Sequence, residues 1–109
     1  MTSPLECEVG SVRSGEPVTV KVRGDVDIAT APEFETSLRQ ALEGSPSSVV
    51  VDLDELSFID SSGLRVLLAF VEEARRQEAS LVLRNVPNHA QRVLEATGLS
   101  HWFERAAER

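Results

Sequence analysis

An unbroken apolar run lies in the middle of the chain, Val49-Val50-Val51 followed by Leu53. A strand with one face in water usually alternates apolar and polar residues, whereas a strand covered on both faces does not. The run therefore predicts the central strand of a sheet, buried on both faces. Apolar stripes at helical spacing come before and after it, which favours an α/β fold with parallel strands joined by helices.

Two segments near the N-terminus alternate apolar and polar residues, as half-buried strands do. Their apolar members are Leu5, Cys7 and Val9 in the first segment, and Val18, Val20 and Val22 in the second. The turn-forming residues 14–17 separate them, which predicts an antiparallel hairpin. A further short buried strand is predicted at residues 81–83. The whole sheet is therefore expected to be mixed, parallel at the helical crossovers and antiparallel at the hairpin.

Three helices are predicted from caps and from apolar stripes. The first has Thr30 as N-cap, Pro32 in its first turn, Glu33 reaching back to the cap, and Gly44 at its end. The second spans Gly63 to Arg76, and the third opens at Pro87 and closes at Gly98. The predicted core-facing residues are Phe34, Leu38, Ala41 and Leu42, then Leu64, Leu67, Leu68, Val71 and either Ala74 or Arg75, and finally Ala90, Val93, Leu94 and Thr97.

The length of 109 residues suits one domain with one core, so a single α/β domain over residues 1–109 is expected. Trp102 and Phe103 near the C-terminus are predicted to pack their aromatic rings on the sheet.

The formal net charge of −7 argues against nucleic acid as a partner, because proteins that bind nucleic acid neutralise its phosphates with Lys and Arg. No apolar run approaches the ~20 residues of a membrane helix, and residues 1–10 lack a signal-peptide pattern. We therefore expect a cytoplasmic protein that does not bind membranes.

Few residues in this chain suit catalysis or metal binding. Cys7 is the only cysteine, and its alternation with apolar neighbours indicates a packed strand residue. The only histidines, His89 and His101, lie in or after the third predicted helix, and no G-x-S-x-G, P-loop or G-x-G-x-x-G motif is present. The sequence thus predicts no enzymatic activity, no metal and no cofactor.

The segment from Asp54 to Leu64 joins the central strand to the second helix and contains Asp60-Ser61-Ser62. Any of these three residues suits a helix N-cap, which would be a purely structural role. The spacing alone supports that role about as well as any function.

The surrounding sequence resembles the STAS family of anti-sigma factor antagonists over nearly the whole chain. The most specific match is residues 49–68, which contain Leu-Ser-Phe-Ile-Asp-Ser-Ser-Gly-Leu. Two further matches follow the family's order, Gly24-Asp25-Val26-Asp27 and Gly98-Leu99. Arg65 departs from the family, whose close members often have a small residue there.

The resemblance implies a STAS-like fold and a partner switch that controls a sigma factor, as in bacterial stress responses. The unphosphorylated chain would bind an anti-sigma factor that is a serine kinase and free the sigma factor. Phosphorylation of Ser61 would block that binding, and a PP2C-type phosphatase would reverse it. An alternative is a STAS module that regulates a transporter or builds a stressosome-like scaffold.

The residues expected to form the partner-binding surface lie around Ser61. They are Asp25, Asp27, Asp60, Ser61, Ser62, Gly63, Leu64 and Arg65. Asp60 either hydrogen-bonds the serine and a partner or only caps the helix. Asp25 and Asp27 either contact a partner or form the turn. Arg65 either influences the partner or the phosphate, or is a solvated helix residue.

Overall fold

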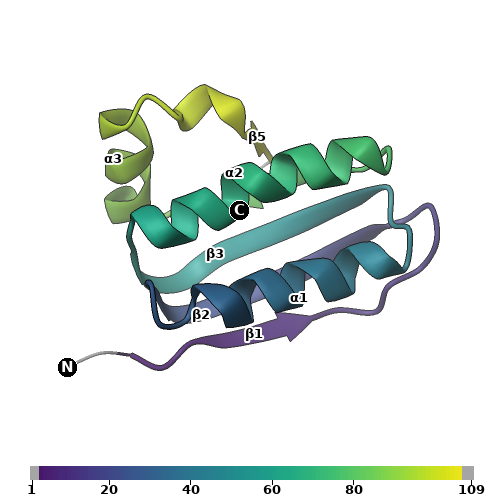
Figure 1. The fold of residues 1–109 in the computed structure, drawn as a ribbon, viewed down its shortest axis with the longest axis horizontal. Coiled ribbons are helices and arrows are strands. Elements are labelled where there is room, and N and C mark those ends of the chain that lie inside the picture. Colours follow the sequence, from purple (N-terminus) through teal and green to yellow (C-terminus); the bar gives the residue numbers. More distant parts are fainter. Residues whose placement is uncertain (1–2, 107–109) are drawn as a thin grey trace.

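Five strands form one sheet whose spatial order follows the chain, β1-β2-β3-β4-β5, in the computed structural model, which describes residues 3–106 (Figure 1). The β1 and β2 strands are antiparallel, and every other pair is parallel. The mixed sheet, the hairpin and the helical crossovers are therefore as predicted. The elements are β1 (Glu6–Val9), β2 (Pro17–Val26), α1 (Ala31–Glu43), β3 (Ser48–Ile59), α2 (Ser61–Arg76), β4 (Ser80–Arg84), α3 (Asn88–Ala96), the 3-10 helix η1 (Ser100–Trp102) and β5 (Glu104–Arg105).

The β3 strand is central, as predicted, but it is not buried on both faces. Val49 and Val51 are fully buried, and α1 and α2 lie side by side over one face of the sheet (Figure 1). Val50 alternates with them and is only partly buried, and Asp52 follows on the same side. The prediction was wrong because valine also suits a half-exposed strand, so an unbroken valine run reflects strand propensity as much as burial.

Helix α1 begins and ends where predicted, but the contacts that define its two ends differ from the predicted ones. Thr30 occupies the N-cap position without a capping hydrogen bond from its side chain. Its hydroxyl donates instead to the Asp25 carbonyl at 2.9 Å, and Asp27 Oδ1 accepts from the amides of Ala29 and Thr30. Gly44 is the C-cap with φ −83°, so it is not left-handed. A Cβ at Gly44 would collide with the Val12 side chain, so close approach explains the glycine.

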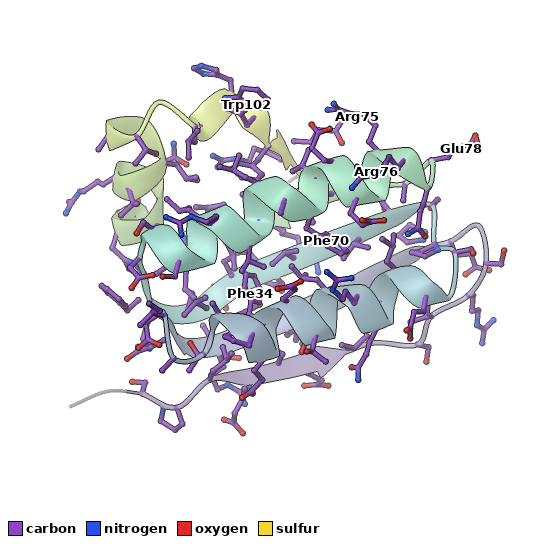
Figure 2. All side chains as sticks on the ribbon, viewed as in Figure 1. Phe34, Phe70, Arg75, Arg76, Glu78 and Trp102 are labelled. Atoms are coloured by element: carbon purple, nitrogen blue, oxygen red, sulfur yellow. The ribbon has the colours of Figure 1, made fainter. Side chains whose placement is uncertain are left out.

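Helices α2 and α3 bury most of their predicted stripes. In α2, Phe70 is buried in the core although it was not among the predicted core-facing residues. Of the two alternatives, Ala74 is buried and Arg75 is exposed (Figure 2). In α3 the buried residues are Ala90 and Leu94, whereas Thr97 is the exposed C-cap. The apolar stripe in the sequence predicts which side of a helix is buried, but not how many residues around the helix are buried. That number depends on the elements that pack against the helix.

Only one of the two C-terminal aromatic residues packs as predicted. Phe103 is buried in the core, whereas Trp102 is 56% exposed and points outward from the end of η1 (Figure 2). The two residues are adjacent and Phe103 is extended, so their side chains leave the backbone in different directions. The prediction for Trp102 was therefore wrong.

Candidate functional site

The start of α2 lies against the ends of the two longest strands. The Asp60 amide donates to the Val26 carbonyl at 3.2 Å, which joins the end of β2 to the turn that follows β3. Gly63 lies close behind this turn. A Cβ on Gly63 would lie 2.7 Å from side-chain carbons of both Ile59 and Val26. Glycine at this position therefore lets the first turn of α2 rest directly on the sheet.

Asp60 is the N-cap of α2. Its backbone is extended, and its Oδ1 accepts hydrogen bonds from the amides of Ser62 at 2.8 Å and Gly63 at 3.4 Å. The backbone carbonyl of Asp60 begins the helix by accepting from the Leu64 amide at 3.1 Å. A carboxylate in this position satisfies two free N–H groups and suits the positive end of the helix dipole. The capping role considered for Asp60 is therefore present.

Ser61 is the first residue of α2 and is exposed. Its hydroxyl makes no hydrogen bond with any residue from 3 to 106. Ser62 differs from Ser61, because it is partly buried and lines the groove between α1 and α2. The two adjacent serines thus present different surfaces, and Ser61 is the one whose hydroxyl faces solvent.

Asp25, near the end of β2, and Asp27, just after that strand, lie at the same end of the sheet, but both carboxylates already accept hydrogen bonds. Asp25 is only 8% exposed, and its Oδ2 accepts from the Ser3 amide at 2.9 Å. The Asp25 amide donates in turn to the Ser3 carbonyl at 3.1 Å, so the aspartate anchors the N-terminal segment. Asp27 is half-buried and holds the turn before α1. Turn chemistry is therefore present at Asp27, whereas Asp25 anchors residue 3 instead. A role in docking remains a prediction for both aspartates.

The remaining predicted site residues follow Ser61 along α2. Gly63 and Leu64 are buried, so they can shape the site but offer little surface to a partner. Arg65 is exposed, one helical turn after Ser61, and it forms no ion pair with any residue of the described segment 3–106. Arg65 therefore supplies a free positive charge beside Ser61.

Two exposed apolar residues at this end of the sheet were not predicted. Ile28 is 80% exposed in the connection before α1, and Phe58 is 48% exposed near the end of β3, in register with Asp25. Large apolar side chains this exposed often mark an interaction surface. A signal was present in the sequence, since Ile28 lies in a polar turn and fits neither neighbouring stripe.

Cys7 and His89 are among the other potentially reactive residues that the structure describes. Cys7 is half-buried, and burial raises the pKa of its thiol above the ordinary value, which makes it a poor nucleophile. The His89 ring contacts the Leu56 carbonyl at 3.1 Å. Within residues 3–106, no group of three or more His, Cys, Asp or Glu residues is arranged to hold a metal ion, and no helix is long and apolar enough to cross a membrane.

Comparisons of the sequence and of the structure with known proteins point to the same family. The family model described as "Mlab, STAS domain" matches residues 9–104. The chain is 33% identical over 94 residues to the anti-sigma-B factor antagonist of Listeria monocytogenes, covering 84% of this chain and 81% of the relative. An anti-sigma factor antagonist from Mycobacterium paratuberculosis superposes with a TM-score of 0.82 and 26% identity, covering 96% of this chain and 89% of the other. Unphosphorylated SpoIIAA shares the fold, with a TM-score of 0.76 at 22% identity over 94% of this chain and 89% of the other.

Proposed function

The chain belongs to the STAS-domain family of anti-sigma factor antagonists, and we propose that it is a partner switch controlled by phosphorylation at Ser61. The unphosphorylated form binds an anti-sigma factor of the serine-kinase type in the cytoplasm and thereby frees a sigma factor. The kinase phosphorylates Ser61 and ends the interaction, and a PP2C-type phosphatase restores it. The chain itself has no catalytic turnover.

The observation that carries this proposal is the exposed Ser61 hydroxyl, which makes no hydrogen bond within residues 3–106, at the start of a helix that another residue already caps. A kinase can modify this hydroxyl without breaking a contact of the fold. Because Asp60 holds the amides of Ser62 and Gly63, a phosphate on Ser61 would not find those two donors free. Its charge of about −1.5 to −2 would remain largely in solvent, beside the carboxylate of Asp60.

That placement explains how charge would gate binding. A partner docked over Ser61 would have to remove water from a dianion whose nearest helix donors are taken, which is costly. Arg65 is a nearby cation that has no ion-pair partner within residues 3–106. It would moderate this cost only if the docked partner did not draw it away from the phosphate. Phosphorylation would therefore weaken docking without unfolding the domain.

Mass mapping tests the modification directly. The purified chain is incubated with ATP and the kinase-type anti-sigma factor, and the modified residue is identified in the wild type, Ser61→Ala and Ser62→Ala. We expect phosphate on Ser61 in the wild type and in Ser62→Ala, and none in Ser61→Ala. Phosphate on Ser62, or on neither serine, would contradict the proposal.

Affinity measurements test the switch. Ser61→Asp places a negative charge at the modified position and should bind the anti-sigma factor about tenfold or more weakly, whereas Ser61→Ala should bind as the wild type does. Equal affinities for Ser61→Ala and Ser61→Asp would refute the switch. Melting temperatures of the three proteins serve as the folding control.

The docking surface in this proposal includes Asp25 and Asp27 with Asp60, Ser61, Ser62, Gly63, Leu64 and Arg65. Asp27→Asn is the sharper test of charge, because the amide oxygen can still accept the hydrogen bonds that Asp27 Oδ1 accepts now. If the Asp27 charge attracts basic groups of the partner, this variant should bind more weakly at low salt, and the difference should shrink at high salt. An unchanged affinity at low salt would remove Asp27 from the surface.

A further inference from the structure

A groove of about 560 Å³ lies between α1 and α2, on the face of these helices turned away from the sheet. Its lining includes two small side chains, Ala31 from α1 and Ala69 from α2, which leave room between the helices. Phe70, itself buried, lies between the helices at the base of the groove (Figure 2). The full lining is Ile28, Ala31, Pro32, Glu35, Arg39, Ser62, Arg65, Val66, Ala69, Phe70, Glu73 and Arg76.

The groove is continuous with the Ser61 region. Ser62 and Arg65 line the end where α2 begins, and the 80% exposed Ile28 lines the same end from the α1 side. Half of the lining residues are apolar, and they run along two neighbouring helices. A surface of this kind accepts the apolar face of a further helix.

The charges along the groove are not equally available. Glu35 pairs with Arg39 at 2.6 Å and Glu73 pairs with Arg76 at 3.1 Å, each along its own helix. Arg65 has no such partner within residues 3–106. A free cation at one end of an apolar groove is complementary to an apolar segment with a carboxylate at the matching end.

We infer that this groove receives an amphipathic helix of the anti-sigma factor, with an acidic side chain of that helix paired to Arg65. The inference rests on the proposed function, because it names the surface through which the same partner is held when it covers Ser61. A second copy of this chain is disfavoured as the occupant, since each copy has a formal net charge of −7. A helix seated in the groove would end beside Ser62, where a phosphate on Ser61 would meet it.

Filling the groove tests the inference. Ala69 is exposed in the middle of α2, so Ala69→Trp places a large ring in the groove without entering the core. Ala96→Trp is the matched control, at an exposed alanine of α3 outside the groove lining. We expect Ala69→Trp to weaken binding of the purified kinase-type anti-sigma factor by about tenfold or more and Ala96→Trp to leave it unchanged.

A second pair of variants tests the charge and does not depend on Ala69→Trp folding. Arg65→Glu should weaken the same binding by about tenfold or more, with a smaller loss at high salt, whereas Arg92→Glu on α3 should not. Wild-type affinity for both Ala69→Trp and Arg65→Glu would overturn the inference. So would self-association of the wild type that Ala69→Trp abolishes, because the groove would then hold a second copy.

The outcome for the groove is separable from the outcome for the switch. If Ser61→Asp binds weakly while Ala69→Trp and Arg65→Glu bind normally, the phosphorylation switch stands and the groove inference is overturned. If Ala69→Trp and Arg65→Glu bind weakly while Ser61→Asp binds normally, the groove is the docking site and phosphorylation at Ser61 does not control it.

Discussion

At the scale of single residues, Asp60 caps α2 and leaves the hydroxyl of Ser61 exposed. The carboxylate of Asp60 holds the amides of Ser62 and Gly63, whereas the Ser61 hydroxyl contributes no hydrogen bond within residues 3–106. Under the proposed function, a structural role and a regulatory role thus fall to adjacent residues. A substitution at one of them should therefore affect stability, and a substitution at the other should affect binding.

Replacing the cap should lower stability. We expect Asp60→Ala to reduce the free energy of unfolding by about 1 kcal/mol, because two amide donors lose their acceptor. Asp60→Asn keeps an acceptor oxygen and should lose less. Ser61→Ala is the matched control and should change stability by less than about 0.5 kcal/mol, since Ser61 is not the cap. Urea denaturation measures all three, and an Asp60→Ala as stable as Ser61→Ala would refute the capping role.

Gly63→Ala should be destabilising although alanine is the better helix former. Alanine gains roughly 1 kcal/mol from helix propensity over glycine. Its Cβ would, however, lie 2.7 Å from side-chain carbons of Ile59 and Val26, and forced repacking of a tight site costs about 1–3 kcal/mol. We expect a net loss in urea denaturation. A more stable Gly63→Ala would show that α2 can move away from the sheet freely.

At the scale of elements, α2 and α3 end in the same way with different residues. In α3 the Leu99 amide donates to the Leu94 carbonyl at 2.9 Å and the Gly98 amide to the Glu95 carbonyl at 3.1 Å, with Gly98 left-handed at φ +74°. These two bonds form a Schellman motif. In α2 the amides of Ala79 and Glu78 make the equivalent bonds, but the left-handed residue is Glu78, at φ +60°.

Glu78→Gly should therefore stabilise the protein. A side chain in the left-handed region costs roughly 1–2 kcal/mol, and glycine avoids most of it at some expense in unfolded-chain entropy. We expect a gain of about 0.5–1 kcal/mol and a higher melting temperature. Gly98→Ala is the converse variant and should lose a similar amount. Opposite signs in a thermal melt support this reasoning, and a destabilised Glu78→Gly would contradict it.

At the scale of the whole molecule, the two faces of the sheet differ in how they are stabilised. Between the sheet and the two helices α1 and α2 lies a continuous apolar core, to which the helices contribute the fully buried Leu38 and Leu67. Elsewhere on the sheet, exposed charges form pairs, such as Arg23 with Glu55 at 2.9 Å and with Glu6 at 3.7 Å. Buried apolar packing contributes far more to stability than solvated ion pairs do.

Core truncation and ion-pair removal should accordingly give very different results. We expect Leu38→Ala and Leu67→Ala each to lose about 2–5 kcal/mol of unfolding free energy, because each leaves a cavity. Arg23→Gln should be close to wild type in the same urea titration. A loss for Arg23→Gln comparable with Leu38→Ala would show that the charged pairs carry stability after all.

The small contribution of the Arg23 pair should depend on pH in a known direction. The hydrogen bond from Arg23 and its positive charge hold the pKa of the Glu55 carboxyl below the ordinary value of 4.5. A lowered folded-state pKa stabilises the fold above the unfolded-state pKa, and this is lost as pH falls through the folded value. Any difference between wild type and Arg23→Gln should therefore be present at pH 7 and vanish in acid. A difference that grows in acid would contradict this sign.

Local patterns in the sequence determined much of this protein. The period of two predicted the hairpin, the helical stripes predicted three helices, and the segment around Ser61 indicated both the family and the start of α2. Such features depend on residues close along the chain, where propensity and periodicity act directly.

Only the tertiary structure decided which parts are covered and which side chains are free. It buried Phe70 and exposed Trp102, it turned the Asp25 carboxylate toward Ser3, and it left Ile28 in solvent. It also formed the groove between α1 and α2 from residues that lie more than 20 positions apart. Burial and hydrogen-bond pairing of this kind depend on how separate elements pack, and neither propensity nor periodicity contains that information.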